Sequence, residues 1–308
     1  MSKILVTGGC GFVGINLVNR LLHDGHQVIV IDDLSSGHKQ SLNNNAIFVD
    51  GSIENDDALS KCFNYKPEYL VHLAALFANQ NSVDHPSRDL FVNGFGTIKI
   101  LEWACKSRVK KVLYSSSSCV YGNKSMMIES DKDLQPDTPY AITKLLGENY
   151  VKFWSTYHKL NVVSVRLFNV YGPGDLPGVY RSVVPNFIKL ALQGKPLTIT
   201  GSGQETRDFC YIDDTVNGIC KVLFNKTIPG DIFNIATGKK TTILEIANII
   251  NKYCNNNQKI LFKKLRDWDI VINRQANIDK ISSQLGFTPS IGVDLGIKKT
   301  CDWLKHNI

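Results

Sequence analysis

Short apolar runs alternate with amphipathic segments through the first half of the chain. The apolar, β-branched runs predict strands at 3–6, 27–31, 46–49, 69–74, 111–115 and 162–167. Apolar residues at helical spacing predict helices between them at 12–22, 57–63, 87–106 and 140–158. Repeated strand–helix units with apolar strands indicate a parallel sheet covered by helices on both faces. The predicted fold class is therefore α/β, a doubly wound parallel sheet of the Rossmann type.

The alternation loosens after about residue 167, where prolines and glycines between 173 and 178 mark loops. Helices are predicted at 183–192, 242–252 and 294–306, and a strand at 231–235 is expected to return to the main sheet. Two domains are expected. Residues 1–170 with about 207–238 form the Rossmann domain, and about 171–206 with 239–308 form a smaller, discontinuous α/β lobe for the substrate.

Composition narrows the classes of partner. The 308 residues are 43% hydrophobic, enough for a large core, and carry a net charge of +7. Lysines and arginines are spread out, with no basic run among aromatics, so an anionic small substrate is expected and nucleic acid is not. No uninterrupted apolar run reaches the eighteen or so residues of a membrane span. The first strand begins at Lys3, without room for a signal peptide, so the expected location is the cytoplasm.

The cysteines and histidines do not form a metal-binding pattern. The eight cysteines include no C-x-x-C pair and lie mostly in apolar segments, which is typical of reduced, packed thiols. The seven histidines include no i, i+4 pair, and His72 is interpreted as a satisfied core residue. No metal ion is predicted.

A glycine-rich stretch, VTGGCGFVG at residues 6–14, joins the first predicted strand to the first predicted helix. Its glycines suit a tight turn, close backbone approach to a pyrophosphate and close helix-to-strand packing. About twenty residues later the second strand ends in Asp32 and Asp33, where a carboxylate can bind an adenosine ribose. A carboxylate repels a 2′-phosphate and no arginine stands beside it, so the predicted cofactor is NAD rather than NADP.

Tyr140 and Lys144 stand at the start of a predicted helix, and their i, i+4 spacing places the phenol and the ammonium on one face. Using a tyrosine phenolate at neutral pH costs about 4 kcal/mol, because the ordinary pKa is about 10. Lys144 and a positive nicotinamide ring would offset most of that cost. Ser117, at the end of a strand, can bond the same substrate oxygen, although geometry alone leaves the choice among serines 115–118 open.

With these motifs the chain resembles the extended short-chain dehydrogenases/reductases that act on nucleotide-diphosphate sugars, whose best-known members are UDP-galactose 4-epimerase and the dehydratases. The resemblance covers essentially the whole chain. Its motifs are TGGCGFVG at 7–14, IDDLSSG at 31–37, HLAA at 72–75, NGFGT at 93–97, SSSSCVYG at 115–122, YAITK at 140–144, RLFNVYGPG at 166–174, GSGQETRDFCYIDD at 201–214 and RDWD at 266–269.

Matching these motifs to the family implies the role of each site residue. The implied catalytic residues are Ser117, Tyr140 and Lys144. The implied cofactor contacts are Gly8, Gly11, Phe12, Val13, Gly14, Asp32, Asp33, Ser52, Ile53, Leu73, Ala74, Ala75, Asn93, Tyr140 and Lys144. The implied substrate contacts are Ser117, Ser118, Asn169, Arg207, Arg266 and Asp269. Arg207 and Arg266 would bind the diphosphate, because arginine can pair with phosphate in a bidentate manner.

Two departures from the family pattern bear on the chemistry. The 4,6-dehydratases carry Asp-Glu directly after the catalytic threonine, where this chain has Ser118 and Cys119, so dehydration is disfavoured. The usual Gly-Asp-Ile of the adenine-binding segment is Gly51-Ser52-Ile53, which leaves Ser52 as a weak substitute for the carboxylate acceptor.

The resemblance implies NAD-dependent oxidation at C4 of a nucleotide-diphosphate sugar through a 4-keto intermediate, with a 4-epimerase expected first. A 4-dehydrogenase that releases the 4-keto product from a GDP- or UDP-linked hexose or heptose would share every catalytic residue. A non-catalytic NAD sensor would not need the Ser117–Tyr140–Lys144 set. The resemblance also implies a homodimer, through the predicted helices 87–106 and 140–158, and a role in carbohydrate biosynthesis.

Overall fold

The computed structural model describes residues 1–267 and 271–308. Its centre is a seven-stranded sheet in which every neighbouring pair is parallel. In spatial order the strands are β11 (Ile232–Ile235), β6 (Val162–Leu167), β5 (Lys111–Ser117), β4 (Tyr69–His72), β1 (Lys3–Thr7), β2 (Gln27–Asp32) and β3 (Ile47–Asp50). The strand order reverses between β1 and β4, which is the switch point of a doubly wound sheet. The predicted fold class is confirmed, as is the return of the 231–235 strand.

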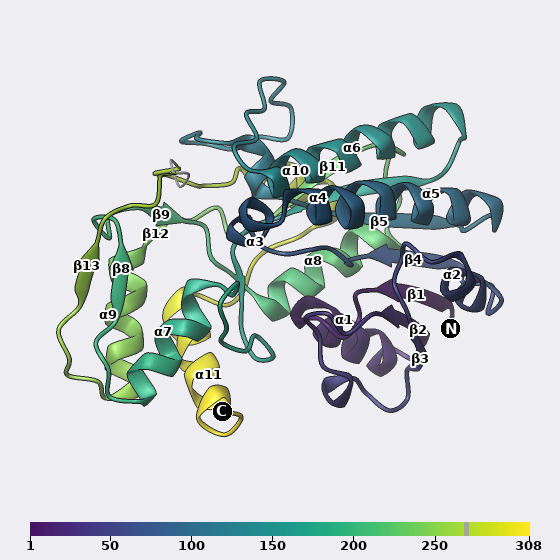
Figure 1. Ribbon diagram of the computed structural model, residues 1–308. Helices are drawn as coiled ribbons and strands as arrows, with labels where there is room; N and C mark the ends of the chain where they lie inside the picture. Colours follow the sequence, from purple (N-terminus) through teal and green to yellow (C-terminus); the bar gives the residue numbers. More distant parts are fainter. Residues whose placement is uncertain (268–270) are drawn as a thin grey trace.

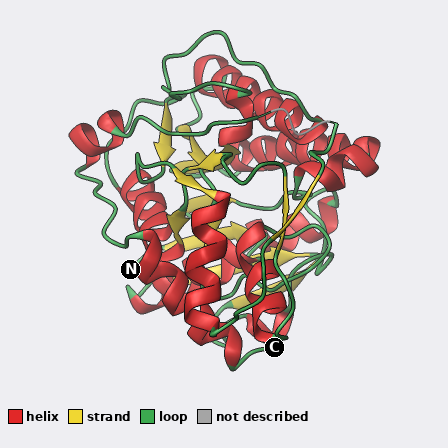
Figure 2. Ribbon diagram, turned by 90° about the vertical axis from the view of Figure 1, so that its left-hand side faces the viewer, coloured by secondary structure: helices red, strands yellow, loops and turns green. Residues whose placement is uncertain are grey.

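Helices cover both faces of this sheet (Figures 1 and 2). Ile4, Val6 and Val28 pack on one face with α1 (Phe12–His23) and α8 (Ile212–Phe224). Leu5 and Ile29 pack on the other with α2 (Asp56–Phe63), α5 (Gly96–Lys106) and α6 (Pro139–Tyr157). Because successive strand residues face opposite sides, a sheet covered on both sides requires the uninterrupted apolar runs seen in the sequence.

Three features of the helices differ from the sequence prediction. The helix predicted at 87–106 is divided into α4 (Pro86–Asp89), a π-helical turn η2 (Leu90–Phe95) and α5, and the π turn buries Asn93. Helix α8 was not predicted, although Val216, Ile219 and Leu223 lie at helical spacing on its buried face. The short helices α3 (Asn79–Asp84) and α10 (Asp279–Leu285) were not predicted either, because each is too short to show a helical period.

The remaining elements lie beyond the carboxyl edge of the sheet, at the left of Figure 1. They comprise α7 (Val183–Leu192), α9 (Ile243–Cys254) and α11 (Val293–Lys305), together with β8 (Thr198–Thr200) paired in parallel to β13 (Leu261–Lys263). Two smaller ladders join β7 (Val170–Tyr171) to β10 (Cys210–Tyr211), and β9 (Thr206–Arg207) to β12 (Thr241–Thr242). The division into two domains stays a prediction.

Candidate active site

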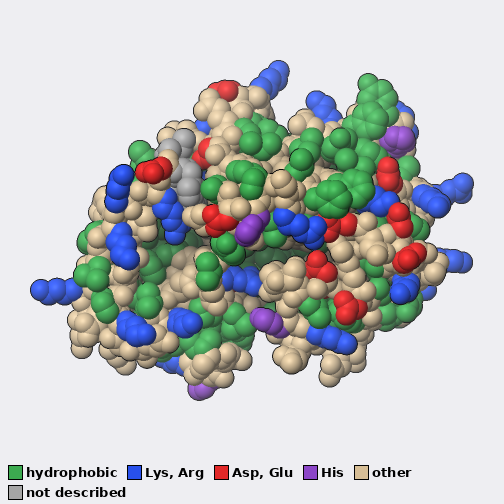
Figure 3. Space-filling model, in the orientation of Figure 1, with side chains coloured by type: hydrophobic (Ala, Val, Ile, Leu, Met, Phe, Trp, Pro, Cys, Tyr) green, Lys and Arg blue, Asp and Glu red, His purple; other side chains and the backbone are tan. Residues whose placement is uncertain are grey.

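A cavity of about 700 Å³ lies at the carboxyl edge of the sheet. A hollow crosses the middle of the molecular face in Figure 3, with Lys and Arg side chains along it. The cavity brings together nearly all of the residues that the sequence analysis singled out. Those that line it are Gly8, Gly11, Phe12, Val13, Gly14, Asp32, Asp33, Ser52, Ile53, Leu73, Ala74, Ala75, Ser117, Ser118, Tyr140, Lys144, Asn169, Arg207 and Arg266.

The glycine turn leaves no space for side chains where it meets the sheet and the helix. Gly8 has φ +69°, and a Cβ there would lie 2.7 Å from Ala74 N. A Cβ on Gly14 would lie 2.2 Å from the Gly8 carbonyl oxygen. Helix α1 starts after Gly11 with no side-chain cap, so the first backbone N–H groups are free to bind an anion. This cradle fits the pyrophosphate of a dinucleotide.

The carboxylates after β2 shape the loop that follows. Asp32 Oδ2 accepts a hydrogen bond from Cys10 N at 2.9 Å, and its Oδ1 accepts one from Leu34 N at 2.9 Å. Burial raises the pKa of Asp32, and the two backbone donors oppose that rise. Ser52 lines the cavity, and its hydroxyl is engaged within the protein, because Oγ donates to Glu54 Oε2 at 2.7 Å and accepts from Glu54 N at 3.3 Å.

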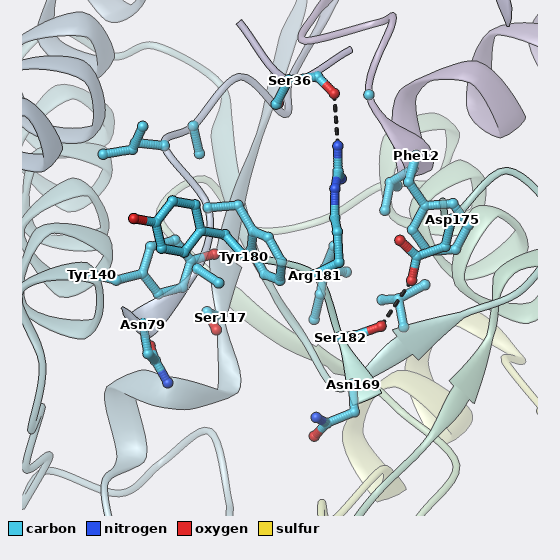
Figure 4. Close-up of a pocket in the computed structure, with 18 of the residues that line it drawn as sticks. Phe12, Ser36, Asn79, Ser117, Tyr140, Asn169, Asp175, Tyr180, Arg181 and Ser182 are labelled. Carbon is cyan, nitrogen blue, oxygen red and sulfur yellow. Dashed lines mark hydrogen bonds between the residues drawn. The ribbon is translucent and has the colours of Figure 1, made fainter. Parts of the chain in front are cut away.

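The three implied catalytic residues come from two elements that pack together. Ser117 ends β5, and its Oγ accepts a hydrogen bond from Cys119 N at 3.2 Å. Helix α6 begins with Thr138 as its N-cap and Pro139 as its first residue, so Tyr140 lies in the first turn of the helix. Lys144 lies one turn later and donates from Nζ to the Ser115 carbonyl at 2.9 Å. Figure 4 shows Ser117 and Tyr140 at the cavity wall.

Burial controls the protonation of the pair on α6. Tyr140 and Lys144 are 8% and 3% exposed. Burial raises the pKa of Tyr140 well above its usual range, and a hydrogen bond with Ser117 opposes that rise. Burial lowers the pKa of Lys144 to about 8, while the charge of Asp89 opposes the decrease. The Lys144 Nζ lies 5.6 Å from the centre of the Tyr140 ring.

A buried carboxylate stands behind this pair. Asp89 accepts hydrogen bonds from Thr143 Oγ1 at 2.6 Å and from Asn93 Nδ2 at 2.8 Å. Asn93 Oδ1 in turn accepts from Leu76 N at 2.8 Å, which holds the loop after β4. Asn93, an implied cofactor contact, therefore uses its amide within the protein and is not among the cavity-lining residues described. Asn93 lies in the π turn η2 and its side chain is buried there, and no sequence motif predicts this turn.

The substrate side is assembled from distant segments. Asn169 lines the cavity, and its Oδ1 is buried without a hydrogen-bond partner in the described part of the chain. Arg207 donates from Nη1 to the Thr206 carbonyl at 2.9 Å. Arg266 is exposed at the rim. The last implied contact, Asp269, lies outside the described residues.

A loop that the motifs did not identify closes one side of the cavity. Arg181 donates from Nη2 to the Ser36 carbonyl at 2.6 Å, and Tyr180 OH donates to Asp84 Oδ2 at 3.1 Å. Ser182 Oγ donates to the buried Asp175 at 2.8 Å (Figure 4). The sequence marks a loop after about residue 173, but which of its side chains line the cavity depends on the folded loop.

Other expectations concern His72, the cysteines, metal ions and membrane spans. His72 is buried between two threonines, with its ring nitrogens 2.7 and 3.1 Å from Thr7 Oγ1 and Thr97 Oγ1, so the core interpretation is confirmed. All eight cysteines are free. Within residues 1–267 and 271–308, no group of three His, Cys, Asp or Glu side chains is placed to hold a metal ion. Over the same residues, no helix is both long and apolar enough to cross a membrane.

Comparison with known proteins identifies the family. A model of the NAD dependent epimerase/dehydratase family matches residues 4–236. The chain belongs to this family. It is an enzyme of the extended short-chain dehydrogenase/reductase type, and its cofactor is NAD, in agreement with the glycine cradle and Asp32.

Individual relatives are similar to this chain along nearly their whole length. A putative UDP-glucose 4-epimerase of Methanocaldococcus jannaschii is 34% identical over 307 residues, 99% of each chain. The structure of Thermotoga maritima UDP-glucose 4-epimerase with UDP-glucose has a TM-score of 0.94 at 32% identity and covers 99% of each chain. The structure of Methanobrevibacter ruminantium UDP-N-acetylglucosamine 4-epimerase with UDP-N-acetylmuramic acid has a TM-score of 0.93 at 30% identity, covering 100% of this chain and 99% of that one. The expectation of a nucleotide-sugar 4-epimerase is confirmed.

Proposed function

We propose that this family member interconverts the C4 epimers of a UDP-linked hexose, with Tyr140 as the acid–base group. The observation that carries the proposal is the convergence of Ser117, Tyr140 and Lys144 in the same cavity that the cofactor cradle lines. Ser118 and Cys119 stand where a dehydratase needs an acid and a base, so this constellation favours epimerisation over dehydration. The UDP moiety is taken from the relatives, two of which are named for UDP-glucose.

Each residue has a role that its surroundings support. Tyr140 removes the proton from the C4 hydroxyl, and Ser117 orients the same oxygen through a hydrogen bond. Lys144 stays cationic at neutral pH and lowers the cost of the phenolate. When bound, NAD accepts a hydride from C4 and returns it to the other face of the sugar. Asn169, which lines the cavity, contacts the sugar or a phosphate, and Arg207 and Arg266 bind the diphosphate.

We also propose a homodimer that covers an apolar surface on the helices beside the site. Hydrophobic side chains gather over α5 and α6 in Figure 3. On η2, Leu90, Phe91 and Phe95 are at least 41% exposed, and on α6 the same holds for Ile142, Phe153 and Tyr157. A patch of this kind typically marks a protein–protein interface. The eight free cysteines favour a reducing compartment, in keeping with the cytoplasm, and a nucleotide-sugar substrate favours a role in carbohydrate biosynthesis.

A single experiment tests the reaction. The purified enzyme is incubated with UDP-, GDP-, CDP- and dTDP-sugars, while the absorbance of reduced nicotinamide is followed and the products are weighed by mass spectrometry. We expect a UDP-sugar to give an isomer of unchanged mass with little lasting reduced cofactor. Accumulation of reduced cofactor, with a product two hydrogens lighter, would instead show a 4-dehydrogenase that releases its keto sugar.

A further inference from the structure

A buried carboxylate behind the catalytic helix takes no part in the chemistry described above. Asp89 is 0% exposed and ends α4, next to the π turn η2. Its Oδ1 accepts a hydrogen bond from Thr143 Oγ1 at 2.6 Å, and its Oδ2 accepts one from Asn93 Nδ2 at 2.8 Å. Burial raises the pKa of Asp89, and these donors together with the charge of Lys144 oppose the rise. Both oxygens act as acceptors, as they do in an ionised carboxylate.

The carboxylate joins the catalytic helix to the cofactor loop. Thr143 directly precedes Lys144 on α6. Asn93 donates to Asp89 and presents its own Oδ1 to Leu76 N at 2.8 Å. Because an ionised carboxylate can only accept, it fixes which end of the Asn93 amide faces it. Leu76 lines the cavity in the loop after β4, so the position of that loop relative to α6 depends on Asp89.

The charge of Asp89 also acts on the two titratable groups of α6. Burial lowers the pKa of Lys144 to about 8, and Asp89 opposes the decrease. Burial raises the pKa of Tyr140 well above its usual range, and Asp89 adds to the rise. Cys119, which accepts a hydrogen bond from Arg274 Nη1 at 3.3 Å, acts on both groups in the same direction in its thiolate form. The carboxylate therefore favours the protonated form of both side chains.

Other titratable groups face Lys144 from the neighbouring strands and from its own helix. His72 on β4 stays neutral, because burial and the charge of Lys144 lower its pKa to about 3. Burial raises the pKa of Tyr114 on β5, whose ring centre lies 5.3 Å from Lys144 Nζ, so this phenol stays protonated. Glu148 on α6 is paired with a buried arginine at 2.7 Å. The negative charge that acts on Lys144 therefore comes chiefly from Asp89.

We propose that Asp89 is a positioning residue for the reaction, which holds the catalytic helix against the cofactor loop and keeps Lys144 protonated while Tyr140 exchanges a proton with the C4 oxygen. This inference rests on the proposed function and adds a residue to it. Asp89 is not among the described residues that line the cavity, so it acts through its neighbours rather than on the sugar. No bond to the carboxylate forms or breaks during the reaction.

The first test removes the charge and keeps the size of the side chain, in Asp89→Asn. The interconversion of UDP-glucose and UDP-galactose by the NAD-loaded enzyme is measured from about pH 5 to about pH 10. We expect kcat at the optimum of the wild type to fall about 10-fold. The acid limb of the profile, set by Tyr140, and the alkaline limb, set by Lys144, should both move to lower pH. NAD should bind about 10-fold more weakly, because one of the two hydrogen bonds at this position is lost.

A second measurement does not depend on the substrate. NMR of NAD-loaded enzyme with isotope-labelled lysine side chains follows the titration of Lys144, which is assigned from its absence in Lys144→Met. In Asp89→Asn this titration should occur at lower pH than in the wild type. If the wild type turns over no nucleotide sugar, the proposed function fails, and the titration of Lys144 still decides whether Asp89 acts on it.

Asp214→Asn is the matched control. Asp214 is also buried, at 3% exposed, and accepts a hydrogen bond from Ser290 Oγ at 2.9 Å, but it lies on α8, which covers the other face of the sheet. This variant should lose stability and keep the pH profile, the Lys144 titration and the NAD affinity of the wild type.

Two results would overturn the inference. One is an equal loss of activity at every pH in Asp89→Asn with both limbs in their wild-type places, which a purely structural residue would give. The other is an unchanged titration of Lys144. If Asp89→Asn does not fold, Thr143→Val and Thr143→Ser are compared. The valine removes the hydrogen bond to Asp89 and should lower kcat and NAD affinity, whereas the serine keeps the hydroxyl and should preserve both; equal values in the two variants would rule out the link between α6 and Asp89.

Discussion

The two ends of the cavity are built in different ways. The cofactor end consists of backbone turns at 8–14, 32–36 and 51–53, where glycines allow close approach and N–H groups face the ligand. The sugar end consists of side chains that four separate segments contribute, among them Ser117, Asn169, Arg207 and Arg274. The first end is suited to a ligand shared by the family. The second is suited to variation, because one side chain can change without disturbing a turn.

The difference explains how one fold keeps one cofactor while its substrates diverge. A Cβ on Gly14 meets backbone atoms of Gly8 and Gly9, which cannot move without opening the turn. The contact between Arg274 and Cys119 involves two side-chain tips, and replacing either leaves both backbones in place. Specificity is therefore expected to reside in the sugar end and cofactor binding in the turns.

The largest effect is expected from Tyr140→Phe, which should affect the sugar end of the cavity and leave the cofactor end unchanged. Removing the hydroxyl eliminates the acid–base group but keeps the ring that packs with Cys119 and Phe77. Turnover should fall by about 10⁴-fold, while NAD affinity stays unchanged. Steady-state kinetics and NAD titration check both parts. Full turnover in this variant would refute the assigned role of Tyr140.

The next effect is expected beneath both ends, at the buried pair of Glu148 and Arg166. Arg166 donates to both carboxylate oxygens at 2.8 and 2.7 Å, and Ser116 Oγ donates to the same carboxylate at 2.5 Å. Glu148→Gln leaves a buried guanidinium without its counterion and should lower the free energy of unfolding by about 4 kcal/mol. Urea denaturation measures this. Glu68→Gln, which breaks the exposed pair with Lys110, is the control and should have little effect.

A smaller effect, confined to the cofactor end, is expected from Gly14→Ala. The added methyl group would lie 2.2 Å from the Gly8 carbonyl oxygen, so the turn must open. We expect a loss of about 3 kcal/mol in the free energy of unfolding and weaker NAD binding. Gly292→Ala is the matched control, because a Cβ there meets nothing within 4 Å. Equal NAD affinity in the two variants would contradict the role of this turn.

The smallest effect is expected in the loop over the sugar end. Burial raises the pKa of Asp175 from 3.8 to about 6, and the hydrogen bond from Ser182 opposes the rise. The folded state therefore binds more protons than the unfolded state between these values, and stability falls as pH rises through that window. Asp175→Asn should remove this fall and raise the free energy of unfolding at pH 7 by about 2 kcal/mol. Thermal melts from pH 4 to about 7 test it, with the exposed Asp302→Asn as control. If the free energy of unfolding of Asp175→Asn falls with pH as steeply as that of the wild type, the raised pKa of Asp175 is refuted.

Much of the fold was predictable because its signals are local. Apolar runs of strand length located the six strands of the first half, and the strand at 231–235 was placed in the sheet correctly. The π turn at Leu90–Phe95 was not predictable, because it depends on Asn93 reaching Leu76 and Asp89. Helix α8 was missed even though its sequence has a helical period.

The sequence alone determined the cofactor turn, the Tyr140–Lys144 pair and the parallel sheet, because sterics and helical periodicity act over a few residues. Only the tertiary structure decided which polar groups meet across long separations. Asp89 with Thr143, Arg181 with Ser36, and Arg274 with Cys119 are such pairs. Their contacts depend on how the strand crossovers and loops return to one edge of the sheet. The spacing of the paired residues along the chain does not predict that they meet.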